Sequence, residues 1–157
     1  MVISDAEFIE LVKRNSARIA AILMQTPRVF GDPSRVIYNS RNAPNDMLIN
    51  VSSGRVEVGK DCFFGHGCML LTGTHDYSKL GPERVASYPK EGCDIILEEG
   101  VWLASGVTVL GPARIGKHAV VGAGSLVRGD LAAYGIYVGN PARKVGETDP
   151  AAHSSSR

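Results

Sequence analysis

The chain has 157 residues, enough for one domain with a hydrophobic core of its own. Its 17 Lys and Arg residues nearly balance its 16 Asp and Glu residues, so no strong electrostatic field attracts nucleic acid or an anionic membrane surface. The sequence has neither a signal core nor an apolar run long enough to span a bilayer, which argues against membrane insertion and favours a cytoplasmic protein.

Residues 1–26 are predicted to form an N-terminal amphipathic helix. Ser4 and Glu7 form a capping box, in which each side chain bonds the backbone N–H of the other residue. Pro27 ends the helix. The apolar residues that recur at helical spacing are Phe8, Leu11, Val12, Ile19, Ile22 and Leu23.

Residues 27–147 are predicted to form the main domain, whose centre repeats every six residues. An aliphatic residue returns at each sixth position, and a small or apolar companion follows four residues later. The aliphatic positions are Leu97, Leu103, Val109, Ile115, Val121 and Val127, and the companions are Val101, Val107, Ala113, Ala119, Ser125 and Leu131. The same phase holds upstream at Val58, Phe64 and Leu70, with Val56, Cys62, Cys68 and Thr74 as companions.

A period of six fits neither an α-helix nor a simple half-buried strand, and it is the signature of a parallel β-helix. Each hexapeptide supplies one short strand and one turn, and its aliphatic side chain stacks inward on the equivalent one a coil away. We therefore predict an all-β fold. The N-terminal helix is expected to cover the open end of the β-helix, because an exposed end invites edge pairing. Residues 148–157 have little to bury and are expected to be disordered.

The repeat is interrupted after Leu70. At Thr74-His75-Asp76 the aliphatic rhythm stops, and it resumes only with the segment from Asp94 onward. The residues between are polar and rich in Pro and Gly. Residues 75–94 are therefore predicted to form one loop extruded from the β-helix, with His75 at its root.

The hexapeptides, together with "THD", "GVWLASGVTVLG", "IGKHAVVGAGSLVRGDL" and "VGNPARKV", resemble the hexapeptide-repeat acyltransferases. The similarity is greatest to the bacterial sugar O-acetyltransferases of the maltose/galactoside and colanic-acid types, and it covers roughly residues 48–145. The resemblance implies a left-handed parallel β-helix with three strands per coil and acetyl-CoA as the co-substrate. It also implies a homotrimer with its active sites between neighbouring prisms.

The resemblance implies that His75 is the general base, which removes the proton of an acceptor hydroxyl as that oxygen attacks the thioester. An imidazole suits this task because it accepts and releases a proton near neutral pH. Either Asp76 or a loop carbonyl can orient the ring, and Asp76 is also a candidate to bind the acceptor. Counting back from His75 places Asn45 at an acceptor-binding position, with Asn50 as a competing candidate, while Ser53 stands where an Asp is usual.

On the CoA side, the resemblance places Trp102 beside the pantetheine arm and the backbone N–H of Ser105 on the thioester oxygen, where such a donor is a large catalytic contribution. Ala123 is implied to meet pantetheine through its backbone. Arg128 and Arg143 fall where the nucleotide end of CoA binds, and a guanidinium suits its 3′-phosphate. Family members often have Thr-Lys where this chain has Arg128-Gly129.

The function expected is transfer of an acetyl group to a sugar hydroxyl, in the building of surface polysaccharide or lipopolysaccharide. The first alternative is N-acetylation of a nucleotide-linked amino sugar. A zinc enzyme of the γ-class carbonic anhydrase type is a second, but a ligand histidine is missing at Leu71, five residues after His66, so no metal is expected. A non-catalytic assembly module is the third.

A covalent acyl-cysteine route is disfavoured. Cys62 and Cys68 occupy inward companion positions, where a buried and inert thiol is expected, and Cys93 has no evident base beside it. The three cysteines also lack metal-ligand spacing and fit a reducing compartment. Direct transfer within one ternary complex is therefore predicted.

Overall fold

The computed structural model describes residues 4–23, 27–42 and 46–148. Helix α1 (Asp5–Leu23) begins at the predicted capping box. The Ser4 N–H donates to Glu7 Oε2 at 2.8 Å, and the Glu7 N–H donates to Ser4 Oγ at 3.3 Å. These two bonds satisfy donors that the first helical turn would otherwise leave without partners.

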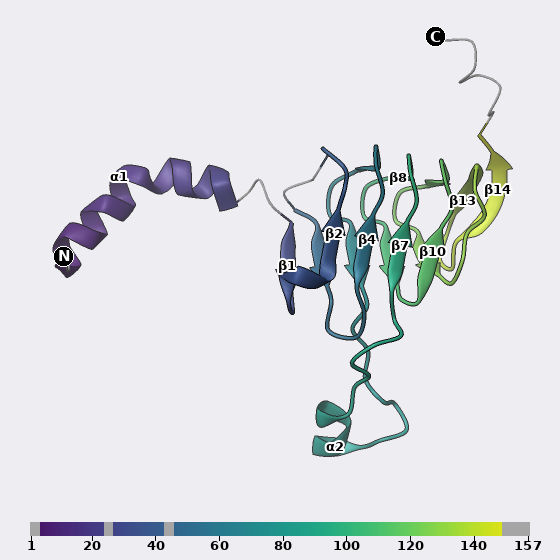
Figure 1. The fold of residues 1–157 in the computed structure, drawn as a ribbon, viewed down its shortest axis with the longest axis horizontal. Helices are drawn as coiled ribbons and strands as arrows, with labels where there is room; N and C mark the ends of the chain where they lie inside the picture. The colour runs from purple at the N-terminus through teal and green to yellow at the C-terminus, as the bar shows by residue number, and fades with distance from the viewer. Residues whose placement is uncertain (1–3, 24–26, 43–45, 149–157) are drawn as a thin grey trace, which may run out of the picture.

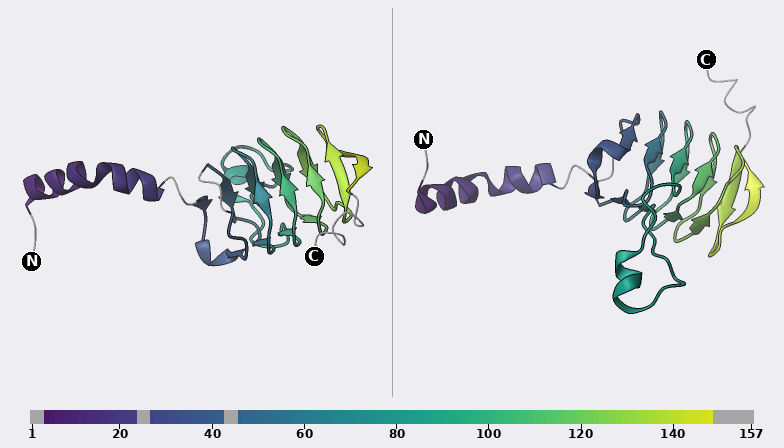
Figure 2. Two further views of the ribbon diagram at one scale, coloured as in Figure 1. Left: turned by 90° about the horizontal axis from the view of Figure 1, so that it is seen from above. Right: turned by 60° about the horizontal axis from the view of Figure 1, so that its bottom comes forward.

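The N-terminal helix does not cover the end of the β-helix, so that prediction is wrong. In Figures 1 and 2, α1 extends away from the first coil instead of folding over it. Its apolar residues Phe8 and Ile9 are 56% and 52% exposed. A helix with an amphipathic sequence is thus formed here without a core to pack on in the single chain.

The main domain is a parallel β-helix whose strands form three faces (Figure 1). Face A contains β1 (Arg28–Phe30), β3 (Leu48–Asn50), β6 (Met69–Leu71), β9 (Thr108–Leu110) and β12 (Leu126–Arg128). Face B contains β2 (Val36–Tyr38), β4 (Val56–Val58), β7 (Ile95–Leu97) and β10 (Ala113–Ile115). Face C contains β5 (Phe63–Phe64), β8 (Trp102–Leu103), β11 (Val120–Val121), β13 (Gly135–Val138) and β14 (Arg143–Glu147).

All pairings between these strands are parallel, apart from the antiparallel pair of β13 and β14 that closes the C-terminal end. From β3 to β12 the chain passes from face A to B to C and back to A, with about one hexapeptide per face outside the loop between β6 and β7. The predicted parallel β-helix of hexapeptide repeats is thereby confirmed, and the architecture is consistent with the left-handed form.

The core consists of the predicted aliphatic positions stacked in register. On face A, Leu70 pairs with Val109, which pairs with Val127, and all three side chains are fully buried. Stacking identical positions removes each branched side chain from water, worth about 1.5–3 kcal/mol per residue. One companion prediction is wrong: Thr74 is exposed, because the chain has left the coil by Gly73.

The interruption is a loop between β6 and β7 that carries the short helix α2 (Gly81–Ala86). It leaves at the corner where face A turns to face B, and it projects from the body in Figure 1. A second short element, the 3-10 helix η1 (Pro33–Arg35), precedes β2. Within the ranges that the structure covers, no helix is both long and apolar enough to cross a membrane.

Candidate active site

His75 is held at the loop root by a backbone carbonyl. Its Nδ1 lies 3.0 Å from the carbonyl oxygen of Arg84, across the loop. Because a carbonyl only accepts hydrogen bonds, Nδ1 carries the proton in this contact. The neutral ring then has its lone pair on Nε2, as a general base requires. Of the two orienting groups considered from the sequence, the structure has the carbonyl.

Asp76 serves the loop and not the histidine. Its Oδ1 accepts hydrogen bonds from the Ser78 N–H at 3.0 Å and the Ser78 hydroxyl at 2.6 Å, and these bonds lower the pKa of the carboxyl group. Its own N–H donates to the Ser87 carbonyl at 2.9 Å, which ties the two arms of the loop together. The adjacent residue thereby fixes where His75 leaves the coil.

Arg84 closes the loop from the other side. Its Nε donates to the Lys79 carbonyl at 2.6 Å and its Nη2 to the Tyr77 carbonyl at 3.4 Å. The same residue's carbonyl receives His75 Nδ1. The conformation of the loop and the orientation of the histidine are therefore linked through one residue.

A pocket of about 350 Å³ opens beside His75. Its lining residues are Phe30, Asn50, Ser52, Gly73, Thr74, His75 and Tyr88. The Tyr88 ring meets the His75 ring edge-on, with 5.9 Å between the centroids. A Cβ on Gly73 would lie 2.7 Å from the Asn50 side-chain nitrogen, so a side chain at this position would displace the Asn50 amide from the segment that leads to His75.

Of the acceptor-binding candidates, the structure brings Asn50 to the histidine. Asn50 is on β3, one coil before His75, and lines the same pocket. Asn45 lies outside the described residues. Ser53 is fully buried, so it does not reach an acceptor. Phe30 and Tyr88 also line the pocket and were missed from the sequence, since β1 and the loop lie outside the clear repeats.

Trp102 lies on face C beside a second hollow. Its ring stacks on Phe63 from the preceding coil, with centroids 5.4 Å apart and planes 16° apart. A groove of about 330 Å³ lies along both rings, and Val120 continues its apolar wall. Trp102 is 41% exposed, so the stacked pair presents a flat apolar surface to solvent.

Ser105 follows at the corner where face C turns to face A. Its hydroxyl accepts the His66 N–H at 3.2 Å, and its carbonyl accepts the Gly124 N–H at 2.9 Å. Within the described part of the chain, the Ser105 N–H donates to no acceptor. Ala123 occupies the equivalent turn one coil later and is exposed. This corner therefore has one free backbone donor.

The two arginines lie apart from both hollows. Arg128 is exposed at the end of β12 on face A. Arg143 is exposed at the start of β14, and its Nη1 donates to the Ala142 carbonyl at 2.9 Å. Neither lines a cavity that contains His75 or Trp102.

The predicted site residues thus fall into two groups on one chain. His75 and Asn50 lie where face A turns to face B, and Ser105 and Ala123 lie where face C turns to face A. The three residues of a face A strand span about 7 Å, and both turns add to this distance. A single chain therefore does not present His75 to the Trp102 groove.

Cys62 and Cys68 are buried, and Cys93 is half-buried at the end of the loop. Burial raises the pKa of both the Cys62 and Cys68 thiols, which keeps them protonated and poorly nucleophilic. The Cys62 thiol donates to the Glu98 carbonyl at 3.0 Å. Among the residues described, no three His, Cys, Asp or Glu side chains gather to hold a metal ion.

These environments predict the reactivity of the thiols. In the native protein at about pH 8, Cys62 and Cys68 should resist iodoacetamide while Cys93 reacts, because the reagent needs an accessible thiolate. In denaturant all three should react alike. Mass spectrometry of peptides quantifies each site, and rapid native labelling of Cys62 or Cys68 would contradict the buried environment.

Comparison with known proteins places this architecture in a family. Residues 94–129 match the model "Bacterial transferase hexapeptide (six repeats)". Over 145 residues the chain is 38% identical to a galactoside O-acetyltransferase of Lactococcus lactis, covering 89% of this chain and 69% of that protein. The chain belongs to the hexapeptide-repeat acetyltransferase family. It is an acyltransferase homologue and not an unrelated β-helix.

Two further members of this comparison widen the range of relatives. The putative lipopolysaccharide biosynthesis O-acetyl transferase WbbJ of Escherichia coli is 30% identical over 115 residues, or 69% of this chain and 59% of that one. The fold is also shared with a mutant of AntD, an N-acyltransferase from Bacillus cereus, solved with dTDP-4-amino-4,6-dideoxyglucose and coenzyme A. That match has a TM-score of 0.63 at 18% identity, covering 83% of this chain and 82% of the other.

Proposed function

We propose that this hexapeptide-repeat acetyltransferase transfers an acetyl group from acetyl-CoA to a sugar hydroxyl, in the building of surface polysaccharide or lipopolysaccharide. Family membership and relatives described as galactoside and lipopolysaccharide O-acetyltransferases support the substrate class. The observation that carries the proposal is His75, with Nδ1 fixed on the Arg84 carbonyl inside a pocket that also contains Asn50.

In the proposed reaction, His75 Nε2 takes the proton of the acceptor hydroxyl as the acceptor oxygen bonds to the thioester carbonyl carbon. The carbon–sulfur bond then breaks, and the same nitrogen returns the proton to the leaving thiolate. The Arg84 carbonyl stabilises the ring while it carries the extra proton, since it accepts from Nδ1–H in both states. Asn50 offers a donor and an acceptor to a neighbouring sugar hydroxyl.

The other substrate, acetyl-CoA, is proposed to bind at Trp102 and Phe63 on face C and at Ser105 and Ala123 in the adjoining turns to face A. These four residues are called the Trp102 corner. The stacked rings of Trp102 and Phe63 provide an apolar wall for the thin pantetheine arm. The free Ser105 N–H is a donor for the thioester oxygen as negative charge develops there. Ala123, one coil further on, is proposed to meet the arm through its backbone, and Arg128 and Arg143 are proposed to bind the phosphates of the nucleotide end.

The proposed chemistry needs a second copy of the chain. His75 and the Trp102 corner lie at different corners of one prism, so a neighbouring prism has to bring its Trp102 corner to this His75. A closed ring of identical chains satisfies this requirement at every interface. We therefore propose the homotrimer with sites between prisms that the family resemblance implied.

The assignment is tested by measuring thiol release from acetyl-CoA with a panel of sugars. Matched hydroxyl and amino sugars, such as methyl galactoside and galactosamine, distinguish O-transfer from N-transfer. Product mass spectrometry identifies the modified atom. Acetylation of the amino group alone would reassign the enzyme to N-acetylation, and no release with any sugar would remove the sugar assignment.

Arg84→Ala is expected to lower kcat by about 10- to 100-fold, because a small misplacement of a catalytic group is costly. The variant loses both side-chain bonds that hold the loop around the carbonyl on His75. The KM for acetyl-CoA should stay unchanged, since the groups proposed to bind CoA lie outside the loop that Arg84 holds. Kinetics across pH measure both quantities, and a purely structural role would not shift the pH profile.

Lys79→Ala is the control for this loop. It removes an exposed ion pair between Lys79 Nζ and Glu83 Oε1, 2.8 Å apart, but keeps the Lys79 carbonyl that Arg84 binds. Exposed pairs are worth at most about 1 kcal/mol. Kinetics of Arg84→Ala equal to those of Lys79→Ala would show that the Arg84 side chain does not position His75.

A further inference from the structure

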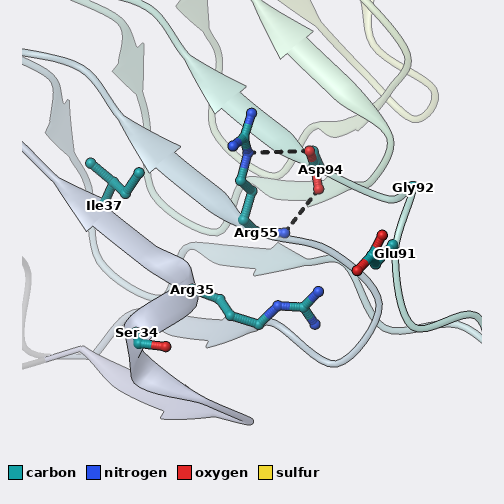
Figure 3. A pocket seen from close by; sticks show the side chains of 7 residues that line it. All are labelled: Ser34, Arg35, Ile37, Arg55, Glu91, Gly92 and Asp94. Atoms are coloured by element: carbon teal, nitrogen blue, oxygen red, sulfur yellow. Dashed lines mark hydrogen bonds and ion pairs between the residues drawn. The ribbon is translucent and has the colours of Figure 1, made fainter.

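A third hollow, separate from the His75 pocket and from the groove beside Trp102, lies beside the loop root on the face B side. Its volume is about 500 Å³, and Figure 3 shows the residues that line it: Ser34, Arg35, Ile37, Arg55, Glu91, Gly92 and Asp94. Three chain segments connect it to the His75 pocket. These segments run from Phe30 to Ser34, from Ser52 to Arg55 and from Tyr88 to Glu91, with one end in each hollow. The two hollows are therefore neighbours.

Arg35 forms the boundary between them. Its Nη1 donates to the Val51 carbonyl at 3.0 Å, and its Nη2 donates to the Lys90 carbonyl at 2.9 Å. Val51 stands between two residues of the His75 pocket, and Lys90 stands between a residue of each hollow. The guanidinium thus joins the β-helix to the returning arm of the loop. Because both acceptors are neutral carbonyls, its charge is available to a ligand beside it.

Two of the remaining groups, Arg55 and Asp94, are held in place by ion pairs and a hydrogen bond. Arg55 Nε lies 3.1 Å from Glu57 Oε1 and 3.3 Å from Asp94 Oδ2, and the Arg55 N–H donates to Asp94 Oδ1 at 3.0 Å. In Figure 3, the Arg55 side chain lies beside Asp94, and the Arg35 side chain points toward the loop segment that contains Glu91. Ile37 is the one large apolar side chain among the seven lining residues.

This set of groups indicates the chemistry of the ligand. Two arginines and two carboxylates line the hollow, so its charges balance and a strongly anionic ligand such as a phosphate is not favoured. Arg35, Arg55 and Asp94 are oriented by the contacts above, and Glu91 adds an exposed carboxylate. Such charged donors and acceptors suit a neutral ligand with many hydroxyls, because each hydroxyl both donates and accepts. The scarcity of apolar wall argues against a lipid or an aromatic ligand.

We propose that this hollow is a second saccharide subsite, so that the acceptor is a chain of at least two sugar units and not a free monosaccharide. The unit that is acetylated lies in the His75 pocket, and the next unit lies across Arg35, between Arg55 and Glu91. This inference rests on the proposed sugar acetylation. It adds the length of the acceptor and names the residues that select it.

The test compares acceptors of different length on the wild type and on Glu91→Gln. The probes are methyl galactoside with lactose, and methyl glucoside with maltose and maltotriose, and kcat/KM is measured for each by thiol release. For an accepted pair, the wild type should favour the longer sugar. In Glu91→Gln the ratio of longer to shorter kcat/KM should fall about 10-fold, as expected for losing a charged hydrogen bond. Arg55→Gln should act in the same direction.

Glu10→Gln, the same change on the exposed face of α1, is the matched control and should keep the wild-type ratio. If the short sugars are acetylated but length brings no advantage and Glu91→Gln keeps the ratio, the second subsite is wrong while sugar acetylation stands. If no probe of either length is acetylated, both the second subsite and the assignment of a sugar acceptor are wrong.

Discussion

Replacing His75 by alanine is expected to lower kcat for acetyl transfer by several powers of ten, about 10²- to 10⁴-fold, as for other positioned bases. Among the described residues, Tyr88 is the one other titratable residue that lines the His75 pocket, and it lies edge-on to the ring and has no carboxylate or imidazole to offer. The loss should therefore not be rescued by a neighbour. Steady-state thiol release with a saturating sugar acceptor measures the effect.

The matched control is His153→Ala, which removes a histidine that no part of the proposed site contains. Both variants should keep the oligomer, read by light scattering, and CoA affinity, read by calorimetry, because the buried columns that carry the fold do not include His75, whose ring contacts the loop at the Arg84 carbonyl and Tyr88. Near-normal turnover in His75→Ala would contradict the assignment of His75 as the general base. A loss of assembly in that variant would show that the histidine is structural.

Two variants that are inactive alone are expected to recover activity when they are assembled together. The first is His75→Ala. The second is Trp102→Ala/Ala123→Glu, which removes the stacked wall and places a carboxylate where the pantetheine arm is proposed to run. The physical reason is the position of the two groups on different corners of the prism, so that each site takes His75 from one chain and the Trp102 corner from the next.

The expected recovery has a definite size. In random trimers formed from equal amounts of the two variants, three quarters are mixed. Each mixed ring contains one interface in three at which both halves are intact. About a quarter of the wild-type activity should therefore return. The variants are mixed in denaturant, refolded together and assayed beside the same variants refolded separately.

A mixture no more active than the separate variants would show that each site is built within one chain. Dimers would return the same quarter, since half of the random pairs are mixed and each mixed pair has one intact site of two, so the number of chains is measured separately by light scattering. A single chain with both intact halves, diluted into an excess of the double variant, provides a further check. The one intact site of that ring should then combine the Trp102 corner of the intact chain with His75 of a neighbouring double-variant chain, so that His75→Ala in the intact chain leaves its activity unchanged.

The residues that stabilise the β-helix are different from the residues proposed to take part in the reaction. The inward aliphatic columns are fully buried and carry the fold, while the groups proposed to act lie on corners and outward faces. Substitutions at His75, Trp102, Ala123 or Glu91 therefore leave the columns untouched. Loss of activity in such variants reports on the site and not on unfolding.

The repeat could be interpreted from the sequence because its information is local. Each hexapeptide brings its own inward residue and its own turn, and stacking needs only that neighbours share the same phase. This is why the buried columns from Leu97 to Val127 and the position of the extruded loop followed from spacing alone. The capping box at Ser4 is local in the same sense. Thr74 failed because the phase continues in the sequence after the chain has left the coil.

The tertiary structure alone determined which residues far apart in the chain contact each other. The Arg84 carbonyl was found on His75 because the loop folds back on itself, which no spacing encodes. Phe30 lines the His75 pocket because β1 pairs with β3, and β1 lies outside the clear repeats. The helix α1 formed as its sequence requires, but its place is set by what it can bury against, and in the single chain its described apolar residues Phe8, Leu11 and Val12 remain exposed. The separation of His75 from the Trp102 corner has the same origin, because the corner a residue occupies depends on how many faces the chain has passed.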